Sequence, residues 1–242
     1  FYHPEESKRF GFITDEMYRK FDRVLGEALQ AIGPDIPVLV LSDHGFAPFR
    51  REVNVNNWLA AKGYLKLAYA DPGSSIFDAA DWGASKAYAL GLNGLYLNLA
   101  GREGHGIVTA GEKRRLLEEI KAGLESMVDP KDGARVITCA YLSEDHFAKD
   151  YIGRAPDIVL GFNRGYRISD DSALGTLSGE MISDNLGWWS GDHCVDPLKV
   201  PASFLSSFKI LKQVPDMQDI APTILKYFGI ATPGSMKGRA II

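Results

Sequence analysis

The strongest constraint on the fold is an uninterrupted apolar run at residues 36–41 (Ile-Pro-Val-Leu-Val-Leu), which ends at Ser42-Asp43-His44-Gly45. Such a run predicts a strand that is buried on both faces and parallel to its neighbours. Ahead of it, apolar residues at three- and four-residue intervals predict an amphipathic helix over residues 14–31, which Gly33-Pro34 ends. A helix followed by a buried strand is typical of a layered α/β fold.

Further helices and strands alternate along the rest of the chain. The Asn93-Gly94 pair predicts a turn between two strands within residues 87–99. Asp219 stands where it can cap a helix that has Pro222 in its first turn. The other expected elements are helices at residues 57–62, 109–128 and 219–229, strands at 64–67, 156–162 and 203–205, and long polar loops at 71–85 and 169–187.

Composition excludes several classes of protein. The chain has 242 residues, 45% of them hydrophobic, and a formal net charge of −4. It can therefore bury a large core, and it has no broad positive field that would favour a nucleic-acid polymer or an anionic membrane. Its apolar runs are too short for a transmembrane segment. Two cysteines are too few for a disulfide framework; they favour a cytoplasmic location, with a periplasmic or secreted one left open.

Two polar clusters hold the residues best suited to chemistry. Asp43 and His44 follow the apolar strand, at the strand end where α/β sheets bind ligands, and a carboxylate with an imidazole suits zinc or manganese. His193, within Ser190-Gly191-Asp192-His193, is a second candidate ligand. Each cluster taken alone fits a structural interpretation better, with Asp43 capping a turn and the histidines bonded within loops. Cys194 lacks a basic neighbour or a partner cysteine and is interpreted as a semi-buried thiol.

Other polar residues carry weaker signals. Asn54, Asn56 and Trp58 follow the first cluster and could line a pocket, although turn and packing roles are favoured. Tyr166 and Arg167 are expected on a surface loop. No serine has the spacing of a nucleophile elbow, which disfavours a serine hydrolase. The residues that would bind a substrate stay unassigned.

Three segments in this order resemble the alkaline phosphatase superfamily, and most closely its type I phosphodiesterase/nucleotide pyrophosphatase branch. They are Ser-Asp-His-Gly-Phe at residues 42–46, Ser-Gly-Asp-His at 190–193, and Asp-Ile-Ala-Pro-Thr-Ile-Leu at 219–225 followed by Met-Lys-Gly-Arg at 236–239. The resemblance implies an α/β fold, the three-layer αβα sandwich of that superfamily. Residues 1–242 would then be the carboxy-terminal portion of one catalytic domain that lacks its N-terminal part.

The resemblance also implies a two-metal phosphoesterase that hydrolyses phosphodiester or pyrophosphate bonds in a small phosphorylated substrate. Members hold two divalent ions, usually zinc, with manganese possible here, and use a Thr or Ser nucleophile. By this resemblance Asp43 and His44 bind one ion and His193 binds the other, while Asp192 has an orienting or turn-forming role. The nucleophile and the remaining ligands would precede Phe1, so we expect no catalytic nucleophile in this chain and little or no turnover from it alone.

Alternatives remain within and outside this superfamily. A phosphonate hydrolase, a phosphoglycerate mutase-like enzyme, a phosphopentomutase or a sulfatase would share the metal scaffold. A degenerate, non-catalytic metal-binding module is the other alternative. Because the missing part would supply strands of the central sheet, we also expect self-association or association with that part.

Overall fold

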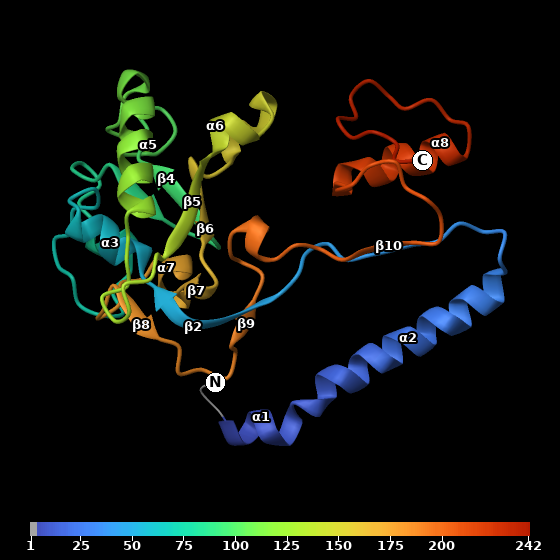
Figure 1. Cartoon of the computed structure of the whole chain (residues 1–242). Coiled ribbons are helices and arrows are strands. Elements are labelled where there is room, and N and C mark those ends of the chain that lie inside the picture. Colours follow the sequence, from blue (N-terminus) through green and yellow to red (C-terminus); the bar gives the residue numbers. More distant parts are fainter. Residues whose placement is uncertain (1–3) are drawn as a thin grey trace. The chain divides into compact units, whose positions relative to one another are not determined.

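The computed structural model describes residues 4–242 and divides them into two compact units. The first unit joins the chain up to Gly45 to Ala202–Ile242, and the second is Phe46–Pro201. Helices and strands are interspersed along the chain (Figure 1), so the predicted α/β class is confirmed. The assignment of all 242 residues to one catalytic domain stays a prediction. No helix in the described part of the chain has the length and apolar character needed to cross a bilayer.

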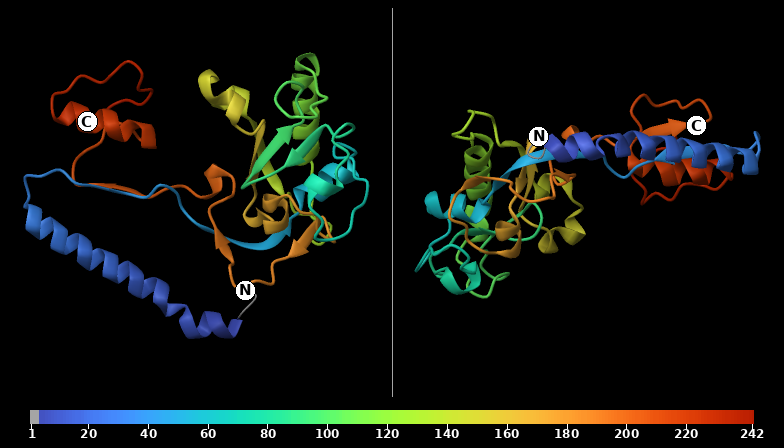
Figure 2. Two further views of the ribbon diagram at one scale, coloured as in Figure 1. Left: turned by 180° about the vertical axis from the view of Figure 1, so that it is seen from behind. Right: turned by 90° about the horizontal axis from the view of Figure 1, so that it is seen from below.

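Helices and a short two-stranded ribbon make up the first unit (Figure 2). Helix α1 (Pro4–Phe10) precedes α2 (Phe12–Ile32), and β1 (Leu39–Leu41) pairs with β10 (Phe204–Ser206). A 3-10 turn, η3 (Met217–Asp219), leads into α8 (Ile220–Tyr227). The helix predicted over residues 14–31 is confirmed as α2, which ends at Gly33 with a positive φ of 79°. None of the residues of α2 is buried, so its apolar stripe lies exposed.

The prediction of a buried parallel strand at residues 36–41 is wrong. Only Leu39–Leu41 forms a strand, and it pairs antiparallel with β10. Val40 and Leu41 are 37% and 38% exposed. An apolar run shows that a strand favours burial, but the direction of pairing depends on the partner, and the partner here is distant in sequence.

The predicted position of the cap of the last helix is confirmed, since Asp219 is the N-cap residue of α8, but the capping hydrogen bond is absent. Instead the Asp219 carboxylate accepts hydrogen bonds from the backbone N–H of Arg239 and of Asp216, both at 2.9 Å, and from Lys212 Nζ at 2.5 Å. These donors, first the Arg239 amide, lower the pKa of Asp219 to about 2. Because η3 precedes α8, the capping role moves to Asp216, and Asp219 holds the C-terminal segment in place.

The second unit contains two sheets. In one, β2 (Ala47–Val53) pairs parallel with β7 (Gly165–Ile168) and antiparallel with β8 (Ile182–Asp184) and β9 (Gly191–Asp192). The other is antiparallel, in the order β3 (Ala87–Ala89), β4 (Gly94–Leu97), β6 (Ile158–Phe162) and β5 (Ile137–Leu142). The remaining helical elements are α3 (Val55–Ala61), α4 (Ile76–Ala79), α5 (Ala110–Glu125), α6 (Ser143–His146), η1 (Lys149–Arg154), α7 (Asp170–Leu174) and η2 (Pro197–Lys199).

The second unit holds most of the core. Helix α5 lies along β5 (Figure 1) and buries Leu116, Leu117, Ile120 and Leu124 on one face. Thr109 and Glu112 form a capping box at its first turn. The predicted helices at 57–62 and 109–128, and the hairpin with Asn93 at a φ of 61°, are confirmed.

Two local predictions in this unit are wrong. Residues 64–67 form no strand, and only an isolated bridge joins Leu67 to Ala80. The expected loops at 71–85 and 169–187 contain α4, α7 and β8. Each short helix begins at a serine whose hydroxyl accepts a backbone hydrogen bond, Ser75 for α4 and Ser169 for α7. These polar residues are therefore helix caps and not a sign of a loop.

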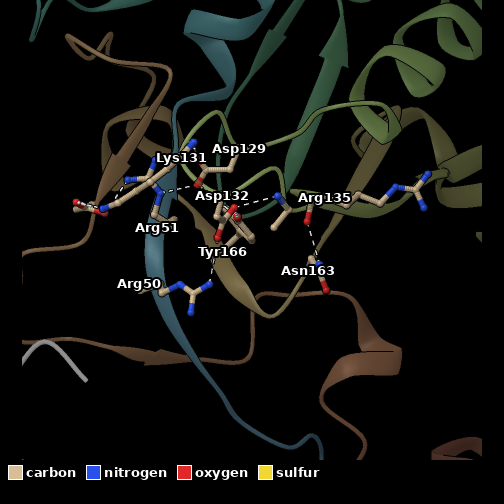
Figure 3. Close-up of polar contacts among 10 residues, drawn as sticks. Arg50, Arg51, Asp129, Lys131, Asp132, Arg135, Asn163 and Tyr166 are labelled. Atoms are coloured by element: carbon tan, nitrogen blue, oxygen red, sulfur yellow. Dashed lines mark hydrogen bonds and ion pairs between the residues drawn. The ribbon is translucent and has the colours of Figure 1, made fainter.

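A polar cluster joins β2 to the turn that follows α5 (Figure 3). Arg51 Nε and Nη2 donate to the two carboxylate oxygens of Asp129 at 2.6 and 2.9 Å, and Nη1 donates to Asp184 at 2.6 Å. The Arg51 side chain is 9% exposed and that of Asp129 is 1% exposed. The Tyr166 hydroxyl contacts Asp129 at 3.3 Å. A buried strand therefore carries an arginine because a distant carboxylate neutralises it.

Candidate metal site

Asp43 and His44 lie next to each other directly after β1, in the first unit. The Asp43 side chain is 82% exposed, and its Oδ1 accepts a hydrogen bond from the His44 backbone N–H at 3.1 Å. On the His44 ring, Nδ1 lies 2.8 Å from the carbonyl oxygen of Gly45. The other ring nitrogen, Nε2, lies 3.4 Å from Asp43 Oδ2. The backbone contact at Nδ1 therefore orients the ring with Nε2 toward the carboxylate.

The spacing of these two donor atoms fits a shared cation. Tetrahedral zinc binds nitrogen and carboxylate oxygen at about 2.0–2.2 Å, which separates two of its ligand atoms by about 3.4 Å. The observed distance from His44 Nε2 to Asp43 Oδ2 is 3.4 Å. Ligating histidines also typically engage a carbonyl or carboxylate through the other ring nitrogen, as His44 does with Gly45. The donor set therefore fits zinc in both chemistry and spacing, and its chemistry also suits manganese.

His193 lies in the second unit, in a segment held by backbone hydrogen bonds. Strand β9 pairs with β2 through Gly191 and Asp192, immediately before the histidine. After it, the Cys194 carbonyl accepts from Asn93 Nδ2 at 3.1 Å, and the His193 carbonyl accepts from the Val195 N–H at 2.8 Å. The His193 side chain is 45% exposed, and its ring lies 5.9 Å from that of Phe46. The backbone is thus fixed while the imidazole faces solvent.

Asp192 occupies the centre of the contacts around His193. Its Oδ1 accepts from the backbone N–H groups of His193 and Cys194, at 2.6 and 2.9 Å, and lies 3.4 Å from His193 Nδ1. Its Oδ2 lies 3.0 Å from Arg167 Nε. Burial raises the pKa of Asp192, but the backbone donors of Cys194 and His193 outweigh burial and place the pKa below its ordinary value. Asp192 is therefore ionised at neutral pH.

Arg167 and Tyr166 are not surface residues, so that prediction is wrong. Tyr166 is 1% exposed and Arg167 is 8% exposed, because both lie in β7 between covered faces. The Arg167 guanidinium pairs with Asp192 and Asp170, and its central carbon lies 5.1 Å from the centre of the Phe49 ring. The contact of Arg167 with Asp192 was not predicted from the sequence; the signal for it was an arginine inside an otherwise apolar strand, a position that needs a carboxylate partner.

The thiol of Cys194 is close to His193 but is protonated at neutral pH. The donor atoms of Asp192, His193 and Cys194 lie within 4.8 Å of one another. Burial, and next the charge of Asp192, raise the pKa of Cys194 to about 11. This agrees with the interpretation of Cys194 as a semi-buried thiol.

Packing roles are confirmed for the three candidates that follow β2. Asn54, Asn56 and Trp58 are 1%, 0% and 3% exposed. The Asn56 side chain donates to the Ala89 carbonyl at 3.0 Å and accepts from the Ala89 N–H at 2.8 Å. It thereby joins α3 to β3 and has no free group to offer a ligand.

The candidate ligands thus divide between the units, Asp43 and His44 in the first and His193 in the second. Their roles as metal ligands stay predictions. A search of curated proteins finds no match. The family model for type I phosphodiesterase/nucleotide pyrophosphatase matches residues 2–194, a span that contains all three candidates. The chain therefore belongs to the type I phosphodiesterase/nucleotide pyrophosphatase family, within the alkaline phosphatase superfamily.

Proposed function

We propose that this chain is part of a two-metal phosphoesterase that hydrolyses phosphodiester or pyrophosphate bonds in a small, nucleotide-like substrate. The observation that carries the proposal is the 3.4 Å spacing of Asp43 Oδ2 and His44 Nε2, inside the span that matches a family of hydrolases. We assign one divalent ion to Asp43 and His44 and a second to His193. Zinc is the preferred ion and manganese the alternative, since both suit carboxylate and imidazole donors.

In this proposal the residues of this chain bind the metal ions and orient the metal ligands; none of them is the nucleophile that attacks phosphorus. Two bound divalent ions would neutralise charge on the attacking and leaving oxygens of an in-line displacement at phosphorus. Gly45 orients His44 through Nδ1, and Asp43 is exposed enough to accept a ligand while it bonds the His44 amide. By the resemblance, we propose that the Thr or Ser nucleophile and the remaining ligands lie outside residues 1–242.

A direct test compares two proteins: the chain of residues 1–242 and the product of the complete open reading frame. The substrates are bis(p-nitrophenyl) phosphate, p-nitrophenyl phosphate, p-nitrophenyl sulfate and p-nitrophenyl phenylphosphonate, with zinc or manganese after chelation. We expect the complete product to prefer the phosphodiester, and His193→Ala to abolish its turnover. The chain alone should give none. Preference for the sulfate or the phosphonate would favour a sulfatase or a phosphonate hydrolase, and metal-dependent turnover by the chain alone would contradict the placement of the nucleophile.

A degenerate binding module is the second candidate function, and metal uptake with no turnover would favour it. Equilibrium dialysis of the complete product against zinc gives the stoichiometry, with Asp43→Asn and His193→Ala as variants. The proposal expects two ions, and each variant should weaken one of them. If both variants bind zinc with the stoichiometry and affinity of the wild type, these residues are not ligands.

A further inference from the structure

We propose that Asp192 and Arg167 form a positioning pair that fixes the His193 ring with its proton on Nδ1 and presents Nε2 to a divalent cation. This inference rests on the proposed function for the identity of the ligand, but the state of the ring in the metal-free protein can be measured independently. Neither Asp192 nor Arg167 would touch the cation; both would act by orienting the ligand His193.

The Asp192 carboxylate lies beside the His193 ring. Asp192 Oδ1 lies 3.4 Å from His193 Nδ1 and receives the backbone N–H groups of His193 and Cys194. One oxygen therefore fixes the main chain of the histidine and stands beside one of its two ring nitrogens. An oxygen that already accepts hydrogen bonds favours a proton on the ring nitrogen that it faces, and with the proton on Nδ1 the other nitrogen, Nε2, is the one that can bind a cation.

The Asp192 carboxylate is itself held by Arg167. The side chains of Asp192 and Arg167 are 11% and 10% exposed, so both charges are largely withdrawn from water. Arg167 Nε is buried and makes no hydrogen bond of ordinary geometry; its charge contact is Asp192 Oδ2 at 3.0 Å. Arg167 is held in turn by the Phe49 ring, over which its guanidinium lies. The arginine therefore prevents the Asp192 carboxylate from rotating away from His193.

His44, in the first unit, has a similar arrangement around its ring nitrogens. There, Nδ1 lies 2.8 Å from a backbone carbonyl and Nε2 faces Asp43. In both units an oxygen faces Nδ1 of the candidate histidine: a carbonyl at hydrogen-bond distance for His44, and a carboxylate at the longer distance of 3.4 Å for His193. This is the arrangement by which proteins select which ring nitrogen binds a metal.

The variant Asp192→Asn separates orientation of the ring from formation of the turn. Its amide oxygen can still accept the two backbone N–H groups, but it removes the negative charge that faces His193 and Arg167. Asp170→Asn is the matched control: it removes the other carboxylate from Arg167, and Asp170 is 72% exposed and has no contact with His193 among those the structure describes.

The primary readout is the tautomer of His193 in the metal-free chain of residues 1–242. Long-range proton–nitrogen NMR spectra at about pH 8.5, well above the usual imidazole pKa of about 6.5, distinguish protonated from unprotonated ring nitrogens, and His193→Gln assigns the signals. We expect an Nδ1–H ring in the wild type and in Asp170→Asn, and a loss of that preference in Asp192→Asn. An Nε2–H ring in the wild type, or no change in Asp192→Asn, would overturn the proposal.

The second readout is zinc affinity, measured on the complete product by competition with a chromophoric chelator. Loss of a partner that orients a ligand typically costs about 10- to 100-fold in metal affinity, and we expect a loss in that range for Asp192→Asn and less than about twofold for Asp170→Asn. A wild-type protein that takes up no zinc would refute the proposed function, while the tautomer would still decide the positioning role. Equal zinc affinity in all three proteins would overturn the proposal.

Discussion

Replacement of Arg51 by methionine should strongly destabilise the second unit. Methionine keeps an unbranched apolar side chain in β2 but leaves the Asp129 carboxylate, 1% exposed, without the cation that binds both of its oxygens. Breaking a buried ion pair by removing one partner costs about 3–5 kcal/mol. Asp129 keeps the Lys131 amide at 2.9 Å and the Tyr166 hydroxyl at 3.3 Å, so we expect the lower end, about 3 kcal/mol.

The neighbouring arginine supplies a matched control. Arg50 lies in the same strand, its side chain is 51% exposed, and it pairs with Asp132 at 3.4 Å, where the carboxylate is 42% exposed. An exposed pair of this kind contributes about 0–1 kcal/mol. Arg50→Met should therefore cost less than about 1 kcal/mol, although it removes the same charge from the same strand.

Urea unfolding followed by tryptophan fluorescence is the assay. All four tryptophans, at positions 58, 82, 188 and 189, lie in the second unit, so this signal reports that unit alone. The double variant Arg51→Met/Asp129→Asn should lose less stability than the sum of its single variants, because no buried charge remains unpaired. If Arg51→Met costs no more than Arg50→Met, the buried pair does not stabilise this unit and the reasoning is refuted.

Three further predictions concern other parts of the chain. Asp219→Asn should lower the free energy of unfolding by about 1.5–3 kcal/mol at pH 7 because it weakens charge-assisted hydrogen bonds. Since the pKa of Asp219 is lowered to about 2, this stability is present above the ordinary Asp pKa of about 3.9 and is lost as the pH falls toward 2. Urea unfolding followed by circular dichroism should therefore show the stability difference between wild type and variant shrinking in acid, and a difference that stays constant would count against the assignment. Thr109→Ala should cost about 1 kcal/mol through loss of the capping box of α5, and hydrogen exchange in the first turn of α5 should rise; unchanged exchange would contradict it. The chain should self-associate through the exposed stripe of α2, in which Tyr18 and Phe21 are 73% and 65% exposed, and sedimentation should show a weaker association in Phe21→Glu; a monomer at all concentrations would refute this.

Elements with a strong local signal could be predicted from the sequence. The 3.6-residue period places α2, and the turn at Asn93-Gly94 needs a residue that tolerates a positive φ, which Asn93 adopts. Both signals depend only on neighbouring residues. They were sufficient for the fold class and for several elements, but not for the pairing of the strands.

Strand β2 shows why the rest could not be predicted. Its residues alternate between buried and exposed, but two arginines and a proline give it a polar sequence. Arg51 can be buried there because Asp129 lies 78 positions further along the chain. The same holds for Arg167, whose partner Asp192 is distant in sequence; an arginine within a strand indicates that it needs a carboxylate, but one sequence does not show which carboxylate that is. The direction of β1 likewise depends on β10.

The candidate site was predicted from a combination of motifs, and the structure added the orientation of the rings. Asp43 and His44 were proposed as ligands because they follow an apolar strand that was expected to be buried and parallel. They do follow β1, but β1 is antiparallel and partly exposed, so the prediction now depends on the motif and on the spacing of the two donor atoms. The contacts at Nδ1 of the two histidines follow from loop geometry, which no spacing rule describes. Residue type alone could identify the donors but could not show which ring nitrogen is presented.

Anomalous diffraction at the zinc edge, from zinc-loaded crystals of the complete product, tests the central claim most directly. We expect one peak within about 2.0–2.2 Å of Asp43 and His44 Nε2, and a second at the same distance from His193 Nε2. Zinc bound elsewhere, or bound at His193 through Nδ1, would contradict the claim.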